Sequence, residues 1–160
     1  MDSVRNTIDK FRNMRHVEME FVLKNVSEQK YNNIVSLLKK QNLKMESFLI
    51  IDQFTDTGLR ITDKKVINKI IKSKIDFINF CFNVKAELPI QESIGKIINT
   101  RTKSRISFND KYLIIDATYI KESDTYEIEI EIDPVLSLCH SSNHILKKCK
   151  VYLESFGAYI

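Results

Sequence analysis

Glutamate alternates with bulky apolar residues in two segments near opposite ends of the chain. Residues 126–133 read Tyr-Glu-Ile-Glu-Ile-Glu-Ile-Asp, and residues 17–23 read Val-Glu-Met-Glu-Phe-Val-Leu. This alternation is typical of β-strands, whose successive side chains point to opposite faces. The carboxylates of each segment therefore share one face, with successive ones about 7 Å apart. A solvated outer face could carry these charges, but the recurrence of the pattern favours a shared charged site.

The remaining hydrophobic pattern predicts strands bracketed by helices. Apolar residues at helical spacing predict helices over 3–14, 28–41 and 143–155, with Ser3, Ser27 and Asn143 as N-caps. Strands are predicted over 17–23, 46–54, 57–63, about 66–73, 77–88, 98–108, 111–120 and 124–133. Short polar breaks at 56–58 and 109–110 are typical of hairpins. The sequence predicts one α+β domain spanning 1–160, with an eight-stranded antiparallel sheet that can close into a barrel flanked by helices.

Composition narrows the class of protein. The chain has 160 residues, of which 29% are charged and 43% hydrophobic, as expected of one soluble globular domain. It has no apolar run of membrane-spanning length, and its start lacks the apolar core of a signal peptide. Cys81, Cys139 and Cys149 have no zinc-site spacing, which favours reduced thiols in an intracellular protein, cytoplasmic or nuclear. The net charge of +4 permits an anionic partner.

A basic strand lies between the two acidic ones. Arg101, Lys103 and Arg105 occupy alternate positions, so their side chains project from one side of the strand. Other charged strand residues are Arg60, Lys85 with Glu87, and Asp116, which shares a face with Thr118. Strands that are acidic at both ends of the chain and basic between them predict a charged interior matched to a charged ligand.

Each kind of charge favours a different ligand. Clustered carboxylates favour a hard cation such as Mg²⁺ or Mn²⁺, which takes oxygen ligands. Alternating Arg and Lys favour phosphate oxygens, to which Arg can make bidentate contacts. Together they predict metal-assisted cleavage of a polyphosphate.

These motifs resemble, in order and approximate spacing, those of the fungal and viral RNA triphosphatases of mRNA capping, within the triphosphate tunnel metalloenzymes. The resemblance runs from about residue 17 to 133. It is strongest over 99–133, with Arg-x-Lys-x-Arg-x-Ser, Ile-Asp-x-Thr and Tyr-Glu-Ile-Glu-Ile-Glu. Residues 17–21 resemble the family's first metal motif, and residues 85–89 its central acidic strand. Val22 stands where the related adenylate-cyclase and thiamine-triphosphatase branch has Lys, which favours the capping branch.

The resemblance implies a role for each charged residue. It implies that the Mg²⁺ or Mn²⁺ ligands are Glu18, Glu20 and Glu131. It implies that the catalytic carboxylates are Glu129 and Glu87, which position the attacking water, Glu127, which braces the basic side chains, and Asp116, which orients a neighbouring cation. The phosphate-binding residues that it implies are Arg60, Lys85, Arg101, Lys103 and Arg105. The family has one more lysine on the strand after Arg60, for which Lys72 is preferred here over Lys74.

By this resemblance the chain is a metal-dependent RNA 5′-triphosphatase that removes the γ-phosphate as the first step of mRNA capping. Two alternatives stay open. One is a tunnel hydrolase of inorganic triphosphate or nucleoside triphosphates. The other is a non-catalytic polyphosphate- or RNA-binding module, which the complete acidic set argues against. The expected partners are a triphosphate RNA end and a guanylyltransferase or methyltransferase, or the remainder of a larger capping enzyme, with no membrane involved.

Three minor expectations complete the sequence-based interpretation. The abundance of Asn, Ile and Lys suggests an AT-rich genome, such as that of a virus. The three histidines have no spacing that implies a shared metal site. The expected core aromatics are Phe48, Phe54, Phe77 and Phe80, since a base-stacking role would require exposed rings.

Overall fold

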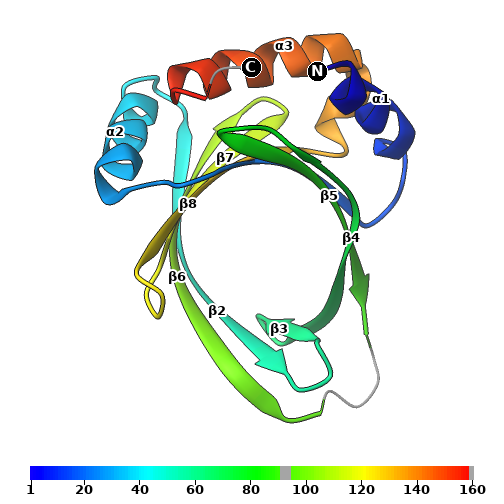
Figure 1. Ribbon diagram of the computed structural model, residues 1–160, viewed down its shortest axis with the longest axis vertical. Helices are drawn as coiled ribbons and strands as arrows, with labels where there is room; N and C mark the ends of the chain where they lie inside the picture. The colour runs from blue at the N-terminus through cyan, green and yellow to red at the C-terminus, as the bar shows by residue number, and fades with distance from the viewer. Residues whose placement is uncertain (91–94, 159–160) are drawn as a thin grey trace.

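A computed structural model of the chain describes residues 1–90 and 95–158. In these residues eight antiparallel strands form a closed barrel, in the order β1-β5-β4-β3-β2-β6-β7-β8, with three α-helices beside it (Figure 1). The strands are β1 (Val17–Leu23), β2 (Lys44–Thr55), β3 (Arg60–Thr62), β4 (Lys65–Asp76), β5 (Phe80–Pro89), β6 (Ile97–Asp110), β7 (Leu113–Ile120) and β8 (Thr125–Ile132). The helices are α1 (Asp2–Phe11), α2 (Glu28–Lys39) and α3 (Ser142–Ser155), with a short 3₁₀ turn at Leu136–Cys139. The predicted closed α+β barrel is confirmed.

Two of the three predicted helix caps are wrong. Ser27 caps α2 as predicted, because its side chain accepts a hydrogen bond from the Lys30 amide. Helix α1 begins one residue before Ser3 and has no side-chain cap. Helix α3 is capped by Ser141, whose hydroxyl accepts from the amide of His144, so Asn143 already lies inside the first turn.

The hydrophobic core lies outside the barrel, between its wall and the helices. On β1 and β8 the apolar residues of the alternating pattern, such as Phe21 and Ile130, are fully buried and belong to one cluster with Ile8 of α1 and Leu153 of α3. Figure 1 shows the three helices gathered on one side of the barrel. Burial of each such side chain contributes roughly 1.5–3 kcal/mol. The same alternation then turns the polar residues of these strands toward the barrel interior.

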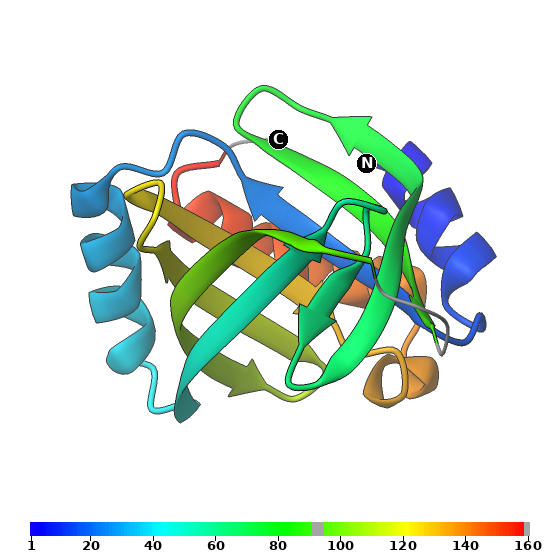
Figure 2. The ribbon, with the colours of Figure 1, turned by 90° about the horizontal axis from the view of Figure 1, so that it is seen from below.

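The opposite side of the barrel is not covered by helices. Figure 2, which views this side, shows β2 and β3 with no helix across them. On β2, Leu49 is 73% exposed and Ile51 is 50% exposed, whereas the apolar residues of β8 are buried. None of the helices in the described residues is long and apolar enough to cross a membrane.

Candidate active site

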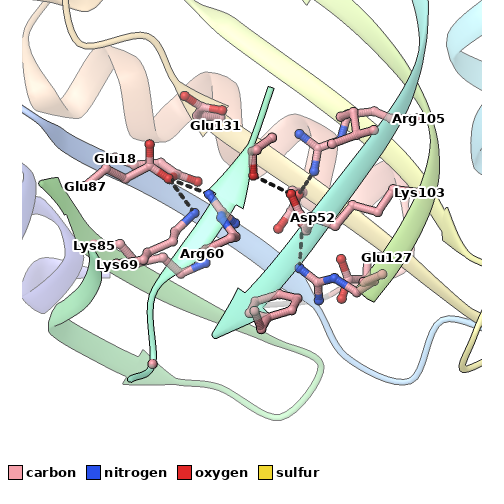
Figure 3. A pocket seen from close by; sticks show the side chains of 16 residues that line it. Glu18, Asp52, Arg60, Lys69, Lys85, Glu87, Lys103, Arg105, Glu127 and Glu131 are labelled. Carbon is pink, nitrogen blue, oxygen red and sulfur yellow. Dashed lines mark hydrogen bonds and ion pairs between the residues drawn. The ribbon is translucent and has the colours of Figure 1, made fainter. Parts of the chain in front are cut away.

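Charged side chains from seven of the eight strands converge on a cavity of about 530 Å³ inside the barrel. Its lining residues are Glu18, Ile50, Asp52, Phe54, Gly58, Arg60, Thr62, Lys69, Lys85, Glu87, Arg101, Lys103, Arg105, Glu127, Glu129 and Glu131. Figure 3 shows Glu18, Glu87 and Glu131 on one side of this cavity and Lys103, Arg105 and Glu127 on the other. The volume is that of a small-molecule site, and the lining is that of a site for a highly charged ligand.

The carboxylates of β1 and β8 face one another across neighbouring strands. Glu20 pairs in register with Glu131, and Glu18 lies two residues earlier on the same face of β1. Burial raises the pKa of Glu131 to about 8, and the negative charges of Glu18, Asp116 and Glu20 add to this shift. Burial likewise raises the pKa of Glu129. Both carboxylates are therefore buried without enough positive charge around them to keep the pKa at its ordinary value.

Two lysines currently neutralise part of the cluster. Lys69 Nζ lies 2.7 Å from a carboxylate oxygen of Glu18, and Lys85 makes an ion pair with Glu20. In this arrangement no three His, Cys, Asp or Glu side chains in the described part of the chain are close enough to hold a metal. The donor set nevertheless fits a hard cation, since it consists of carboxylate oxygens. Glu131, for which no ion pair occurs among the described residues, has the raised pKa that such a cation would lower.

Asp52 of β2 holds two basic residues of β6 in place, and the sequence analysis did not identify it. It is 1% exposed, accepts a hydrogen bond of 2.6 Å from Thr62, and lies 2.6 Å from Lys103 and 3.3 Å from Arg101. Burial alone would raise its pKa, but hydrogen bonds from Lys103 and Thr62 lower it to about 2. Burial, together with the charge of Arg101, lowers the pKa of Lys103 against the opposing effect of Asp52. Asp52 therefore stays ionised and keeps clustered cations in place.

Arg105, the third basic residue of β6, is held by two carboxylates from β7 and β8. Its guanidinium lies 2.7 Å from Asp116 and 3.1 Å from Glu129, and its Nε donates to the Thr118 hydroxyl. Asp116 also accepts a hydrogen bond from Ser107. Asp116 is 4% exposed and does not line the cavity, so its position fits the predicted role of orienting a cation.

Two arginines keep donors free for a ligand. Arg60 contacts Glu87 at 3.0 Å, and Arg101 contacts Asp52, each through one terminal nitrogen. The Nε atoms of both arginines are buried and have no hydrogen-bond partner among the described residues. Buried donors without partners are costly, and phosphate oxygens would satisfy them with charge-assisted hydrogen bonds.

The structure brings nearly all the predicted site residues together. Those that line the cavity are Glu18, Glu87, Glu127, Glu129, Glu131, Arg60, Lys85, Arg101, Lys103 and Arg105. Glu20 and Asp116 lie buried behind this lining, in contact with Lys85 and Arg105. Their individual roles remain predictions.

Lys72 does not line the cavity, and Lys69 takes the place predicted for it. The register between β4 and β5 shifts between Ile71 and Ser73, so a bulge displaces Lys72, whose side chain is exposed. Lys69 pairs in register with Glu87 and contacts both Glu87 and Glu18. The other candidate, Lys74, makes an ion pair with Asp76. No signal in the sequence marks the bulge, which becomes visible only from the pairing of the strands.

The prediction that four phenylalanines are core residues is half wrong. Phe80 is fully buried and Phe77 packs against the core, as predicted. Phe48 is 45% exposed, and Phe54 lines the cavity with Arg101 over its ring at 5.4 Å. By alternation both share the face of β2 that carries Asp52, and this face turns toward the charged cavity instead of the apolar core.

No protein-family model matches the sequence, and no curated protein matches it. Solved structures do match in fold. The RNA triphosphatase Pct1 of S. pombe superposes with a TM-score of 0.76 at 13% identity, over 96% of this chain and 89% of that one. The RNA triphosphatase domain of a trifunctional mimivirus mRNA capping enzyme superposes with a TM-score of 0.69 at 14% identity, over 98% and 96%. The chain has the triphosphate tunnel fold. At these identities the match establishes the fold, and the function rests on the site.

Proposed function

We propose that this chain is a metal-dependent RNA 5′-triphosphatase that removes the γ-phosphate of triphosphate-ended RNA, the first step of mRNA capping. One observation carries the proposal: a cavity inside the closed barrel presents a cluster of carboxylates directly beside a set of cations whose donors are not all used. Phosphate binding alone requires only the cations. A buried acidic cluster beside them is costly, and a bound hard cation would both neutralise it and act as a Lewis acid toward the phosphate.

The cations would hold the phosphate chain. Arg101, Lys103 and Arg105 project from one face of β6 along the cavity, at the spacing of alternate strand residues. Arg60 approaches from β3 with an unpaired Nε. These side chains stabilise the charge of the transferred phosphoryl group, which is the main catalytic requirement of phosphoryl transfer.

The carboxylates would hold the cation and the attacking water. Glu18, Glu20 and Glu131 would be ligands of Mg²⁺ or Mn²⁺, and the bound ion would act as a Lewis acid toward the phosphate oxygens. As substrate enters, the ammonium groups of Lys69 and Lys85 can exchange their carboxylate partners for phosphate oxygens, which frees Glu18 and Glu20.

Glu129 is the base that the geometry favours. Burial raises its pKa above that of an ordinary glutamate, which makes it a stronger base, and Arg105 fixes its orientation at 3.1 Å. In the reaction, water attacks the γ-phosphorus, the bond to the β-phosphate oxygen breaks, and Glu129 takes the proton of the water. Glu87, held by Arg60 and Lys69, would position that water. The products are orthophosphate and a diphosphate end.

The proposal extends to the setting of the reaction. We propose an intracellular enzyme, cytoplasmic or nuclear and encoded by a virus, which passes the diphosphate end to a guanylyltransferase or to the remainder of a larger capping enzyme. Among the structural neighbours, Pct1 has been solved in complex with the Spt5 CTD, and the mimivirus domain belongs to a trifunctional capping enzyme. These partners support the proposal by analogy.

The direct test measures phosphate release from three substrates: triphosphate-ended RNA, a nucleoside triphosphate and inorganic triphosphate, each with Mg²⁺ and with Mn²⁺. We expect orthophosphate and a diphosphate RNA end, with a modest preference for RNA that fades as salt rises, because the additional contacts are nonspecific and electrostatic. Release of pyrophosphate would contradict the mechanism. Cleavage of small triphosphates alone would establish the tunnel-hydrolase alternative, and binding without cleavage would establish the non-catalytic one.

A further inference from the structure

The two ends of the cavity differ in chemistry. The strands are antiparallel, so one end of the barrel holds the end of β2 and the starts of β6 and β8. The other end holds the start of β1 and the end of β8. Glu18 and Glu131 lie at this second end of the barrel, which we call the acidic end. There, with Glu87, they also line a smaller depression together with Pro89 and Pro134.

Phe54, Gly58 and Arg101 form the other end, which we call the Phe54 rim. Phe54 is the last residue but one of β2, and Arg101 lies near the start of β6. All three residues line the cavity. Phe54 and Ile50 are the only side chains in the lining that consist entirely of hydrocarbon. An aromatic ring therefore stands at the mouth of an otherwise polar tunnel.

The rim has room beside the ring and support behind it. A side chain added at Gly58 would meet no atom within 4 Å, so the space next to the β2–β3 turn is open. The Arg101 guanidinium lies over the Phe54 ring at 5.4 Å and is itself tied to Asp52 at 3.3 Å. The ring is thus held in place before any ligand binds, which lowers the entropic cost of stacking on it.

The charges set the direction of a bound polyphosphate. Glu18, Glu20 and Glu131 would hold the cation that activates the scissile phosphate, so the γ-phosphate belongs toward the acidic end. The phosphates nearer the ribose then extend past Lys103 to Arg101, and the nucleoside emerges beside Phe54. This argument rests on the proposed function, since it takes the γ-phosphate as the group that is cleaved.

We infer that the Phe54 rim binds the 5′-terminal nucleoside of the substrate, with its base stacked on Phe54. Every base has a π-face, so this contact discriminates a nucleoside or RNA triphosphate from inorganic triphosphate without reading the sequence. It supplies the tunnel with a recognition element for the organic end of its substrate.

Phe48 provides a matched control on the same strand. It lies six residues before Phe54, on the same face by alternation, and it pairs in register with Arg105 near the opposite end of the barrel. It is 45% exposed, and it does not line the cavity. The two phenylalanines therefore distinguish entry of RNA at the Phe54 rim from entry at the acidic end.

The test measures KM for triphosphate-ended RNA, ATP and inorganic triphosphate with the wild type, Phe54→Ala, Phe54→Leu, Phe54→Trp and Phe48→Ala. We expect Phe54→Ala and Phe54→Leu to raise KM for RNA and ATP on the order of tenfold, the usual range for one lost base stack. KM for inorganic triphosphate should stay within about twofold, and Phe54→Trp should restore the wild-type values. Phe48→Ala should change none of them.

A modified substrate tests the same contact without relying on the stability of a variant. RNA whose first nucleotide lacks its base should bind the wild type about tenfold more weakly, and Phe54→Ala should not distinguish it from normal RNA. A selective effect of Phe48→Ala would overturn the inference, and so would an equal rise in KM for all three substrates, which would show that Phe54 acts only by holding Arg101.

The inference and the proposed function fail in different ways. If the wild type releases no phosphate from any substrate, the proposed function fails. Equilibrium binding of ATP and of inorganic triphosphate to the wild type and Phe54→Ala then decides the stacking contact by itself. Equal weakening of both ligands, or of neither, would overturn it, whereas selective loss of ATP binding would support it.

Discussion

The side of the barrel that the helices cover and the side that they leave bare line the same cavity with side chains of opposite charge. We call these sides the covered wall and the bare wall. The covered wall, β1, β7 and β8, has helices behind it and presents Glu18, Glu20, Glu129, Glu131 and the buried Asp116. The bare wall, β2, β3 and the first half of β6, has no helix across it in the described residues and presents Arg60, Arg101 and Lys103.

The difference shows how each set of charges is stabilised. On the bare wall, Asp52 neutralises Lys103 and Arg101 within the wall itself, and Glu87 of β5 neutralises Arg60. The covered wall holds like charges close together, and the pKa values of Glu129 and Glu131 are raised chiefly by burial, with neighbouring carboxylates adding to the shift. Burial of the apolar faces of the same strands under the helices offsets this cost.

The largest expected effect comes from removal of the covered wall's carboxylates. Glu18→Ala, Glu20→Ala and Glu131→Ala should each lower the rate of phosphate release roughly 10³-fold, because each would remove a proposed ligand of the cation. Glu46→Ala is the control, since Glu46 lies on the bare wall with a side chain 45% exposed and, among the described residues, makes an ion pair only with Lys44. Near wild-type activity of any of the three at limiting Mg²⁺ would refute its assignment as a ligand.

The next largest effect is a difference between the two walls in how much a truncated side chain lowers the free energy of unfolding. Ile130→Ala on the covered wall removes a fully buried side chain and should lower the free energy of unfolding by about 2–5 kcal/mol. Leu49→Ala on the bare wall removes one that is 73% exposed and should cost about 0.5 kcal/mol or less. Urea unfolding of both variants measures the contrast. Similar losses would mean that the bare wall is covered in solution, for example by a second copy of the chain.

A third effect depends on pH. The pKa of Glu131 is raised from 4.5 to about 8, so between these values the folded protein retains a proton that the unfolded chain has released. Without metal, the free energy of unfolding should therefore fall as pH rises from about 5 to 8. Glu131→Gln should remove this fall and gain on the order of 2 kcal/mol at pH 8. Saturating Mg²⁺ should flatten the profile of the wild type. A wild-type profile unaffected by either change would show that Glu131 ionises normally.

Alternation in the sequence predicted the barrel and most of the cavity, because a period of two assigns every residue of a strand to one face. It predicted that Arg101, Lys103 and Arg105 would share a face, and they all line the cavity. The caps were harder, since Ser141 and Asn143 are both good cap residues and only the position of the first turn decides between them.

The sequence could not reveal features that depend on pairing between strands. Asp52 follows Phe-Leu-Ile-Ile on β2. This apolar run predicts a buried strand and gives no sign that the next residue is a charged one facing the barrel interior. Its role appears only when β2 is placed beside β6, which brings Lys103 and Arg101 to it. The sequence likewise assigned the additional lysine to Lys72 or Lys74 from their strand alone, and only the pairing of β4 with β5 shows that Lys69 lies opposite Glu87 while Lys72 lies at a bulge.

The smallest expected effect tests whether Lys69, instead of Lys72, contacts the bound phosphate. Lys69 lies between Glu18 at 2.7 Å and Glu87 at 3.0 Å, where a bound phosphate would meet it, whereas Lys72 is exposed on the bulge. Lys69→Ala should lower kcat/KM about tenfold, the value of one charge-assisted hydrogen bond.

The same variant should also lower the Mg²⁺ concentration required for half-maximal rate, because the ammonium group no longer competes for Glu18. Lys72→Ala should change neither quantity, and Lys69→Arg should retain most of the rate. A loss of activity in Lys72→Ala but not in Lys69→Ala would return the phosphate contact to Lys72 and show that the β4 register differs in solution.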